Sequence, residues 1–423
     1  MNKKMTVVAS ICLAAAAQAA WNPGEPVVTY WFGPGCPGQA QTPLNDTWAK
    51  QLKDGNFNTV WASSPEELDV AAKHGLRAIY SVDPTTEWAK VNLDDPVQKA
   101  KLTERINRVK NHPALYIYEH YDEAAAELFP SLARVKEYIH ELDPDHACWF
   151  NLLPTYANNK QLGVEGEIIR AYWEHVRLFG EIYQPEFITY DHYQFKNNGD
   201  APNYFLNLGI IRQSASARKV MFWNGLQACT WRPGSLASPK SPRIPAVDDM
   251  RYLVYSTAAY GAHGLYYYVY CRRGHEGTIA TLDGKTGEKY EALKTINREF
   301  IAISSVLSTL DFTGAYFQGL HAPGTTPYGD QALLKISPET PFAELQPLQE
   351  LTDTTLVTRF DTPGKPTHLM VVNCDYRKER TIHAKAPKAA ERFDALAGTW
   401  SPVGKEFDLT LQRGGGVLLR LAR

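Results

Sequence analysis

The 423-residue sequence has no excess of charge of either sign, because 44 Lys and Arg are balanced by 46 Asp and Glu. Nucleic-acid-binding proteins usually carry a clear basic excess, so we expect no nucleic-acid partner. The six cysteines show neither Cys-x-x-Cys nor Cys/His spacing, so no metal site is expected. Gly33-Pro34-Gly35-Cys36 is not a dinucleotide fingerprint either, and the sequence predicts no cofactor.

Long apolar runs are also missing. The segment from Met5 to Ala17 is apolar but shorter than the roughly 20 residues that a membrane-spanning helix needs. Lys3 and Lys4 precede it and Ala17-Gln18-Ala19 follows it, which is the pattern of a cleaved secretory signal peptide. We therefore predict a signal peptide over residues 1–19, no membrane span, and a periplasmic or secreted mature protein. One of the six cysteines, Cys12, lies in the predicted signal peptide. An oxidising compartment permits a disulfide among the other five, but we expect most of them to be buried as small apolar residues.

What the sequence does contain is a regular alternation of apolar, β-rich runs and amphipathic helical stretches from residue 27 to residue 310. Eight strand–helix units over about 290 residues are typical of a (β/α)8 barrel. An open doubly wound sheet is the alternative, but it usually has fewer strands and a glycine-rich first turn. After residue 310 the runs alternate and are bounded by Pro, Gly and Asp. The prediction is an α/β protein with a (β/α)8 TIM barrel over residues 20–310 and an antiparallel β-sandwich over residues 311–423.

Candidate site residues follow from the barrel, because active sites of this fold lie at the C-terminal ends of the strands. The fourth strand is followed by Asp122 and Glu123, and the sixth by Asp191. These acids come from different walls of the barrel and can converge on one cleft, while aromatic and neutral polar side chains suit the faces and hydroxyls of sugars. The predicted substrate-binding residues are Trp31, Asn151, Tyr190, His192, Trp223, Asn224, Gln227 and Tyr268.

Carboxylates facing each other in an aromatic cleft are what glycoside hydrolysis needs: one protonates the leaving oxygen and the other attacks, or activates water, at the anomeric carbon. Competing chemistries lack their residues, since the sequence has no strand-end lysine for a Schiff base, no glycine-rich phosphate cradle and no Gly-x-Ser-x-Gly elbow. Purely structural roles for these acids stay open. Glu123 could be a first-turn helix acid, and Asp191 could pair with a basic residue in a loop.

The stretch from His112-Pro113-Ala114-Leu115 to Asp122-Glu123 resembles barrel glycoside hydrolases, many of which read His-Pro-Ala-Leu, a tyrosine-rich strand and then Asp-Glu-Pro. The resemblance extends over most of the barrel, and it implies a carbohydrate substrate and Glu123 as the general acid. Two departures stand out. Ala124 replaces the usual proline, and residues 222–227 lack the seventh-strand glutamate that many β-galactosidases and cellulases use as nucleophile.

Two mechanisms remain compatible with these residues. In one, Glu123 is the acid and Asp191 is the nucleophile or base. In the other, Asp122 and Glu123 resemble the pair of N-acetylhexosaminidase-type barrels, in which the Asp orients an acetamido group that attacks. Two other classes stay open as well: a non-catalytic carbohydrate-binding protein, and a polysaccharide lyase with Tyr193 or His192 as the base.

Overall fold

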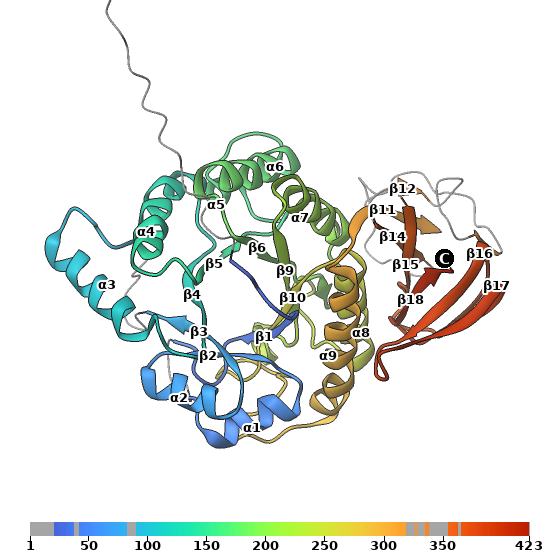
Figure 1. The fold of residues 1–423 in the computed structure, drawn as a ribbon, viewed down its shortest axis with the longest axis horizontal. Helices are drawn as coiled ribbons and strands as arrows, with labels where there is room; N and C mark the ends of the chain where they lie inside the picture. Colours follow the sequence, from blue (N-terminus) through green and yellow to red (C-terminus); the bar gives the residue numbers. More distant parts are fainter. Residues whose placement is uncertain are drawn as a thin grey trace, which may run out of the picture.

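The structure is a computed structural model that describes residues 21–37, 42–82, 90–318, 326–327, 335–337, 354–362 and 365–422. The predicted signal peptide, residues 1–19, lies outside this part of the chain. Figure 1 shows a ring of strands surrounded by helices, with a second sheet beside it. None of the described helices is both long and apolar enough to cross a membrane.

Eight parallel strands form a nearly closed barrel, in the order β1-β10-β9-β6-β5-β4-β3-β2. Their bounds are β1 (Val27–Trp31), β2 (Thr59–Ala62), β3 (Arg77–Ser81), β4 (Leu115–Asp122), β5 (Ala147–Leu152), β6 (Phe187–Asp191), β9 (Met221–Gln227) and β10 (Gly264–Tyr268). The ring closes between β1 and β2 through Asn58, whose amide donates to the Val28 carbonyl at 3.2 Å and whose Oδ1 accepts from the Val28 amide at 3.0 Å. The predicted (β/α)8 barrel is confirmed.

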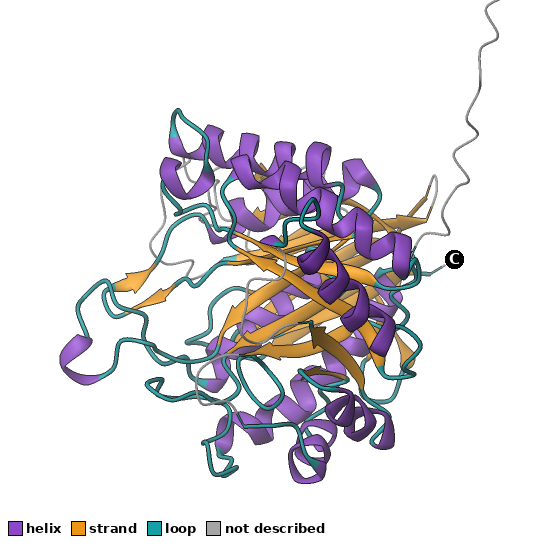
Figure 2. Ribbon diagram, turned by 90° about the vertical axis from the view of Figure 1, so that its left-hand side faces the viewer, coloured by secondary structure: helices purple, strands orange, loops and turns teal. Residues whose placement is uncertain are grey.

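Helices cover the outside of the barrel, as the side view in Figure 2 shows. Several begin where the sequence supplies a cap: Ser64 accepts from the Glu67 amide and is followed by Pro65, and Asp95 accepts from the Val97 amide and is followed by Pro96. Their bounds are α1 (Asp46–Asp54), α2 (Pro65–Lys73), α3 (Pro96–Val109), η2 (Ala126–Leu128), α4 (Phe129–Leu142), α5 (Asn159–Leu162), α6 (Ile168–Leu178), η3 (Phe179–Tyr183), α7 (Tyr204–Arg218), η4 (Gly234–Leu236), α8 (Val247–Ala259) and α9 (Glu288–Leu307).

Indole rings fill the interior of the barrel. Trp149 of β5 packs edge to face against Trp31 of β1 at 5.0 Å and against Trp223 of β9 at 5.8 Å between ring centroids, and Trp61 of β2 lies 5.2 Å from Trp149. Aromatic pairs in these orientations add stabilisation beyond the area that they bury. The lower barrel is therefore a solid core, and only the end above this layer is open.

A short antiparallel hairpin, β7 (Phe195–Lys196) and β8 (Gly199–Asp200), lies between β6 and α7. This hairpin was not predicted, because two-residue strands have no detectable periodicity. The hairpin lies next to the loop after β9, since the Asn197 amide donates to the Ser241 carbonyl at 3.0 Å. It belongs to the C-terminal end of the barrel, where β6 and β9 both end.

After α9 the chain forms a largely antiparallel sheet, in the order β12-β11-β14-β15-β18-β16-β13, with β17 paired to β16. Its strands are β11 (Asp311–Gln318), β12 (Thr326–Pro327), β13 (Lys335–Ser337), β14 (Thr355–Thr362), β15 (Lys365–Asn373), β16 (Arg380–Asp394), β17 (Thr399–Leu411) and β18 (Gly416–Leu421). One apolar cluster of this sheet joins side chains of β14, β15 and β18 to those of the long β16–β17 hairpin, among them Val357, Val371 and Leu409. The predicted C-terminal antiparallel β-structure is confirmed.

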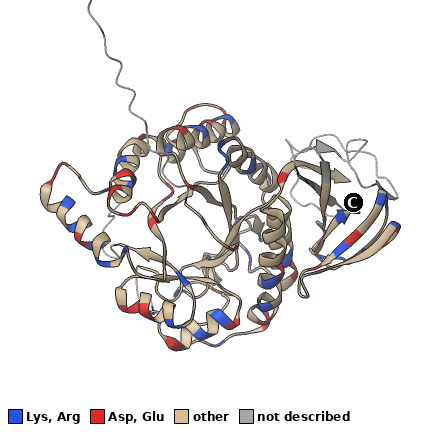
Figure 3. Cartoon of the chain, in the orientation of Figure 1, with Lys and Arg blue, Asp and Glu red and all other residues tan. Residues whose placement is uncertain are grey.

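The other face of this sheet shares a core with the barrel helices. Phe317 of β11 packs on Phe205 of α7 at 4.9 Å, and Phe312 stacks on Tyr260 at 5.8 Å between centroids. Figure 1 shows the sheet alongside α8 and α9. Figure 3 shows acidic and basic residues interspersed over the outer helices, as the balanced composition implies. All five cysteines in the described part are buried and unpaired.

Candidate active site

Asn151, at the end of β5, lies at the centre of the polar groups at the open end of the barrel. Its Nδ2 donates to Asp191 Oδ1 at 2.8 Å and to Asp122 Oδ1 at 3.1 Å. Its Oδ1 accepts from the Tyr266 hydroxyl at 2.7 Å and from Thr189 Oγ1 at 3.3 Å. These partners fix the amide so that its N–H groups point at the two carboxylates. A single buried side chain thus joins strands β4, β5, β6 and β10.

A β-bulge in β4 brings Asp122 into the barrel. The pairing of β4 with β5 shifts between Glu119 and Tyr121, so Glu119 pairs with Trp149 and Asp122 pairs with Asn151. His120 and Tyr121 both contact Phe150, on the outer side of the sheet. Without the extra residue the alternation of side chains would turn Asp122 outward. The bulge is therefore what allows this acid to face the cavity.

Glu123 follows directly, in a left-handed backbone conformation with φ of 53°. Its amide donates to the Asn151 carbonyl at 3.0 Å, which ties this conformation to the end of β5. Non-glycine residues adopt left-handed φ values at a cost of order 1–2 kcal/mol, and such strain gathers at functional sites. The Glu123 carboxylate lines the cavity and makes no hydrogen bond to any described side chain.

The three carboxylates of the site have raised pKa values, and burial is the largest cause for each of them. Loss of hydration at the end of the barrel, together with the Glu123 charge, raises the pKa of Asp122 to about 7, although the Asp122 side chain is exposed to solvent in the cavity. Burial and the Glu123 charge also raise the pKa of Asp191 well above its usual range, against the opposing effect of its hydrogen bond from Asn151. Burial raises the pKa of Glu123 too. Raised pKa values favour retention of protons by this group, because closely spaced carboxylates do not all ionise together.

The carboxylates open onto a cavity of about 320 Å³ with aromatic walls. This volume lies at the small end of the range for ligand pockets, about 300–1,000 Å³. Tyr193, Trp231 and Tyr268 form one wall, with centroid distances of 5.1 to 5.3 Å among them. The full set of lining residues is Trp31, Phe32, Asp122, Glu123, Asn151, Tyr156, Asp191, Tyr193, Trp231, Tyr266 and Tyr268.

Similar folds occur among solved structures. The chain aligns with a glycoside hydrolase family 5 structure from Bacteroides vulgatus at a TM-score of 0.54 and 15% identity, over 95% of this chain and 94% of that one. A second structure, described as a glycoside hydrolase, aligns at a TM-score of 0.51 and 15% identity, over 95% of this chain and 98% of that one. The chain shares the fold of barrel glycoside hydrolases. No protein-family model and no curated protein sequence matches it.

On β9, where the resemblance led us to look for a glutamate, the structure has Gly225 facing the interior. A β-carbon on Gly225 would collide with the ring and hydroxyl of Tyr266, so this position has no room for a longer side chain while Tyr266 bonds Asn151. The carboxylates of the cavity come instead from β4 and β6.

Of the eight predicted substrate-binding residues, Trp31, Asn151 and Tyr268 line the cavity. Tyr190, His192 and Asn224 do not, because alternate residues of a strand point to opposite faces. Thr189 and Asp191 face inward, whereas Tyr190 is fully buried between them and His192 bonds Asn207 of α7 at 3.1 Å. The Asn224 amide donates to Thr257 of α8 at 2.8 Å.

Trp223 and Gln227 face other parts of the structure. Trp223 belongs to the indole layer beneath the cavity and is fully buried. Gln227 bonds the backbone of the β7 hairpin, accepting from the Phe195 amide at 2.9 Å and donating to the Phe195 carbonyl at 3.0 Å. Tyr190, His192, Trp223, Asn224 and Gln227 thus lie outside the set of residues that lines this cavity.

Aromatic residues that the sequence interpretation did not select also line the cavity: Tyr156, Trp231, Phe32 and Tyr266. Trp231 lies in the loop after β9 and Tyr156 in the loop after β5. Each is an aromatic residue just beyond the end of a barrel strand, and this position could have identified it from the sequence. In the described part of the chain, no group of three or more His, Cys, Asp or Glu side chains is arranged to hold a metal ion.

Proposed function

We propose that the protein is a glycoside hydrolase that cleaves O-glycosidic bonds of oligo- or polysaccharides. The observation that carries the proposal is the convergence of three carboxylates, from β4 and β6, on one cavity walled by aromatic rings. Acidic pairs with raised pKa values supply both a proton donor and an anion, which are the two requirements of the reaction. The aromatic walls suit the apolar faces of sugar rings.

In this proposal Glu123 is the general acid. Glu123 lines the cavity and its carboxylate makes no hydrogen bond to a described residue. Burial raises its pKa, which favours the protonated form that a general acid needs. The proton passes to the glycosidic oxygen as the bond to the anomeric carbon breaks. Positive charge then develops on the sugar ring, next to the anions at the base of the cavity.

Asp191 is the second carboxylate, supported by Asp122. One nitrogen of Asn151 reaches an oxygen of each, so those two oxygens cannot be farther apart than the sum of 2.8 and 3.1 Å. Inverting enzymes hold their acid and base about 6.5–9.5 Å apart, with a water between them. That separation applies to Glu123 and the second carboxylate. Asp122 and Asp191, which are linked by one amide nitrogen of Asn151, form the pair that supplies this second carboxylate. Asp191 attacks the anomeric carbon or activates water. In the substrate-assisted alternative, Asp122 orients an acetamido group instead.

The decisive experiment compares Glu123→Gln with Glu141→Gln, a matched change on the exposed surface of α4. A panel of 4-nitrophenyl and unactivated glycosides serves as substrate. General acid catalysis is worth about 10²–10⁴-fold, so we expect Glu123→Gln to lose that much on unactivated substrates and less on 4-nitrophenyl glycosides, whose leaving group needs little protonation. Equal activity of the two variants would reject Glu123 as the acid.

The second carboxylate is tested separately. If Asp191 is a nucleophile, Asp191→Asn loses activity and added azide restores turnover by forming a glycosyl azide. If the reaction is substrate-assisted, Asp122→Asn has the larger effect and only 2-acetamido sugars are cleaved.

One observation favours a second candidate function, a carbohydrate-binding protein without catalysis: β9, the seventh strand of the barrel, contains no carboxylate, and its Gly225 packs tightly against Tyr266. Glycans would then raise the melting temperature while the wild-type protein released no sugar.

We also propose that the protein is exported, with residues 1–19 removed and the mature chain in the periplasm or outside the cell, and that residues 20–310 and 311–423 are its two domains. The support for export is the basic start and the apolar run followed by Ala17-Gln18-Ala19. N-terminal sequencing of the mature protein should begin at Ala20. Recovery of the full-length chain from the cytoplasm alone would contradict export.

A further inference from the structure

Lys196 places a positive charge beside two of the aromatic rings that line the cavity. Its ammonium lies 5.5 Å from the ring centroid of Tyr156 and 6.0 Å from that of Trp231, and both rings line the cavity. The Lys196 charge also acts on Asp191, whose pKa it lowers. Among the described residues no carboxylate lies within ion-pair distance of this ammonium. The cation therefore lies beside the aromatic rings of the cavity, with Asp191 as the carboxylate whose charge acts on it.

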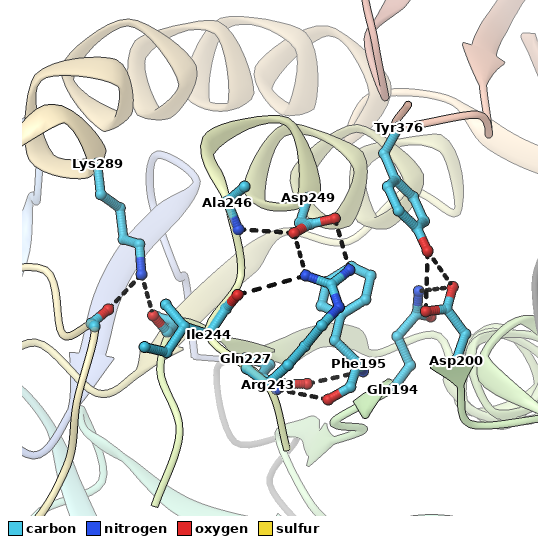
Figure 4. A network of polar contacts seen from close by, with 12 residues as sticks. Gln194, Phe195, Asp200, Gln227, Arg243, Ile244, Ala246, Asp249, Lys289 and Tyr376 are labelled. Carbon is cyan, nitrogen blue, oxygen red and sulfur yellow. Dashed lines mark hydrogen bonds and ion pairs between the residues drawn. The ribbon is translucent and has the colours of Figure 1, made fainter. Parts of the chain in front are cut away.

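The position of Lys196 is fixed by a network that Figure 4 shows. The preceding residue, Phe195, is bonded through its amide and carbonyl to Gln227, and its carbonyl also accepts from the Arg243 amide at 3.1 Å. The Arg243 guanidinium covers the Phe195 ring at 4.4 Å and is bound to Asp249 at the start of α8. A lysine on an anchored hairpin loses less freedom when it binds a ligand than one on a mobile loop.

The far strand of the hairpin is anchored as well. The Tyr376 hydroxyl bonds Asp200 of β8 at 3.0 Å, and Tyr376 belongs to the C-terminal part of the chain, just after β15. Figure 4 shows this bond on the side of the network opposite Lys289. Both strands of the hairpin are thus held from outside it.

A second cation lies on the other side of the same aromatic wall. The Arg272 guanidinium stacks on Phe32 at 3.5 Å, and its charge acts on Tyr268, whose ring lies 6.0 Å from that of Phe32. Tyr268 packs edge to face against Trp231 at 5.3 Å, and Trp231 lies under Lys196. Neither cation is neutralised by a carboxylate within 4 Å in the described part of the chain. Partial burial of a cation costs free energy unless an anion pairs with it.

We propose that Lys196, assisted by Arg272, is a specificity-determining residue that binds an anionic substituent of the substrate, either a uronate carboxylate or a sulfate ester. The inference rests on the proposed function for the nature of the ligand, but not for catalysis. The carboxylates at the base of the cavity repel an anion, whereas the two cations lie at its aromatic wall. The sugar is therefore held with its charged substituent toward Lys196 and its glycosidic bond toward Glu123.

The test measures binding and turnover with paired probes. The pairs are 4-nitrophenyl glucuronides and galacturonides against the glucosides and galactosides, and 6-sulfated against unsulfated galactosides, in both anomeric forms. Proteins are the wild type, Lys196→Met, Lys196→Arg and, as a matched control, Lys388→Met on the exposed β16. Calorimetry gives Kd, and release of 4-nitrophenol gives kcat/KM.

A hydrogen bond to a charged group is worth about 1.5–3 kcal/mol, so Lys196→Met should weaken binding of the anionic probe about 10- to 150-fold. Neutral probes should change by less than about 3-fold, and Lys196→Arg should retain most of the preference. The carboxylate and sulfate arms show which substituent is bound. Equal losses on neutral and anionic probes, or no preference for anionic probes in the wild type, would overturn the proposal.

These outcomes separate the two proposals. Hydrolysis of neutral glycosides without preference for anionic ones keeps the glycosidase function and removes the anion subsite. Lys196-dependent binding of anionic sugars without hydrolysis of any probe keeps the subsite and removes catalysis.

Discussion

Replacing Asn151 with leucine tests whether this residue sets the ionisation of the carboxylate pair. Leucine has a similar volume but removes the Nδ2 donor that bonds Asp191 at 2.8 Å and Asp122 at 3.1 Å. A hydrogen bond to a charged group contributes about 1.5–3 kcal/mol, and one pKa unit corresponds to about 1.36 kcal/mol. Because the bond favours the ionised form, its loss raises the pKa values of the pair, by about 1 to 2 units.

The assay is a carbon-13 NMR titration of protein labelled at the aspartate carboxyl carbons, with Asp122→Asn and Asp191→Asn used for assignment. Asn224→Leu is the matched control, since Asn224 is a fully buried barrel asparagine that bonds Thr257 away from the cavity. Both leucine variants should lose stability, but only Asn151→Leu should move the carboxyl titrations upward. An unchanged titration in Asn151→Leu would refute the idea that Asn151 holds these groups toward ionisation.

Three further changes have defined outcomes. The raised pKa of Asp122, about 7, means that the folded protein keeps a proton that the unfolded chain loses between about pH 4 and 7, so stability falls as pH rises through this window. Asp122→Asn should therefore raise the melting temperature at pH 8 and leave it nearly unchanged at pH 4; an equal shift at both would contradict the assignment. Gly225→Ala should cost about 1–3 kcal/mol in urea unfolding, because the added methyl group collides with Tyr266; a neutral effect would show that the ring moves freely. Tyr376→Phe should cost about 1.5–3 kcal/mol and speed hydrogen exchange in the β7–β8 hairpin, since the bond to Asp200 is lost; unchanged exchange would show that the hairpin holds without it.

The barrel elements were predictable because local signals and the hydrophobic period agree. The amphipathic stretches between the predicted strands form the barrel helices, such as α2, α4 and α9. The first of these carries the Ser64 cap and Pro65 that mark a helix start. The barrel strands could also be predicted from the sequence, because buried parallel strands appear as continuous apolar runs.

Which side chains face the cavity was less predictable. The strand-end criterion selected Asp191 together with its neighbours Tyr190 and His192. Side chains alternate between the two faces of a strand, however, and this places Tyr190 and His192 on the outside of the barrel. The period of two could have been applied from the sequence. The bulge that turns Asp122 inward could not, because a bulge depends on the pairing of β4 with β5. Likewise, Trp231 reaches the cavity through a loop whose path no local pattern specifies.

The shared core of the two parts has a practical consequence for anyone who wishes to shorten this protein. Phe317, Leu356 and Phe360 of the C-terminal sheet belong to the same apolar cluster as the barrel side chains. Deletion of the chain beyond α9 would expose the apolar surface of α7 and α8 to solvent. It would also remove the Tyr376–Asp200 hydrogen bond that holds the hairpin carrying Lys196. A truncated barrel should therefore aggregate. Any fraction that stayed in solution should discriminate between sugars less well than the full-length chain.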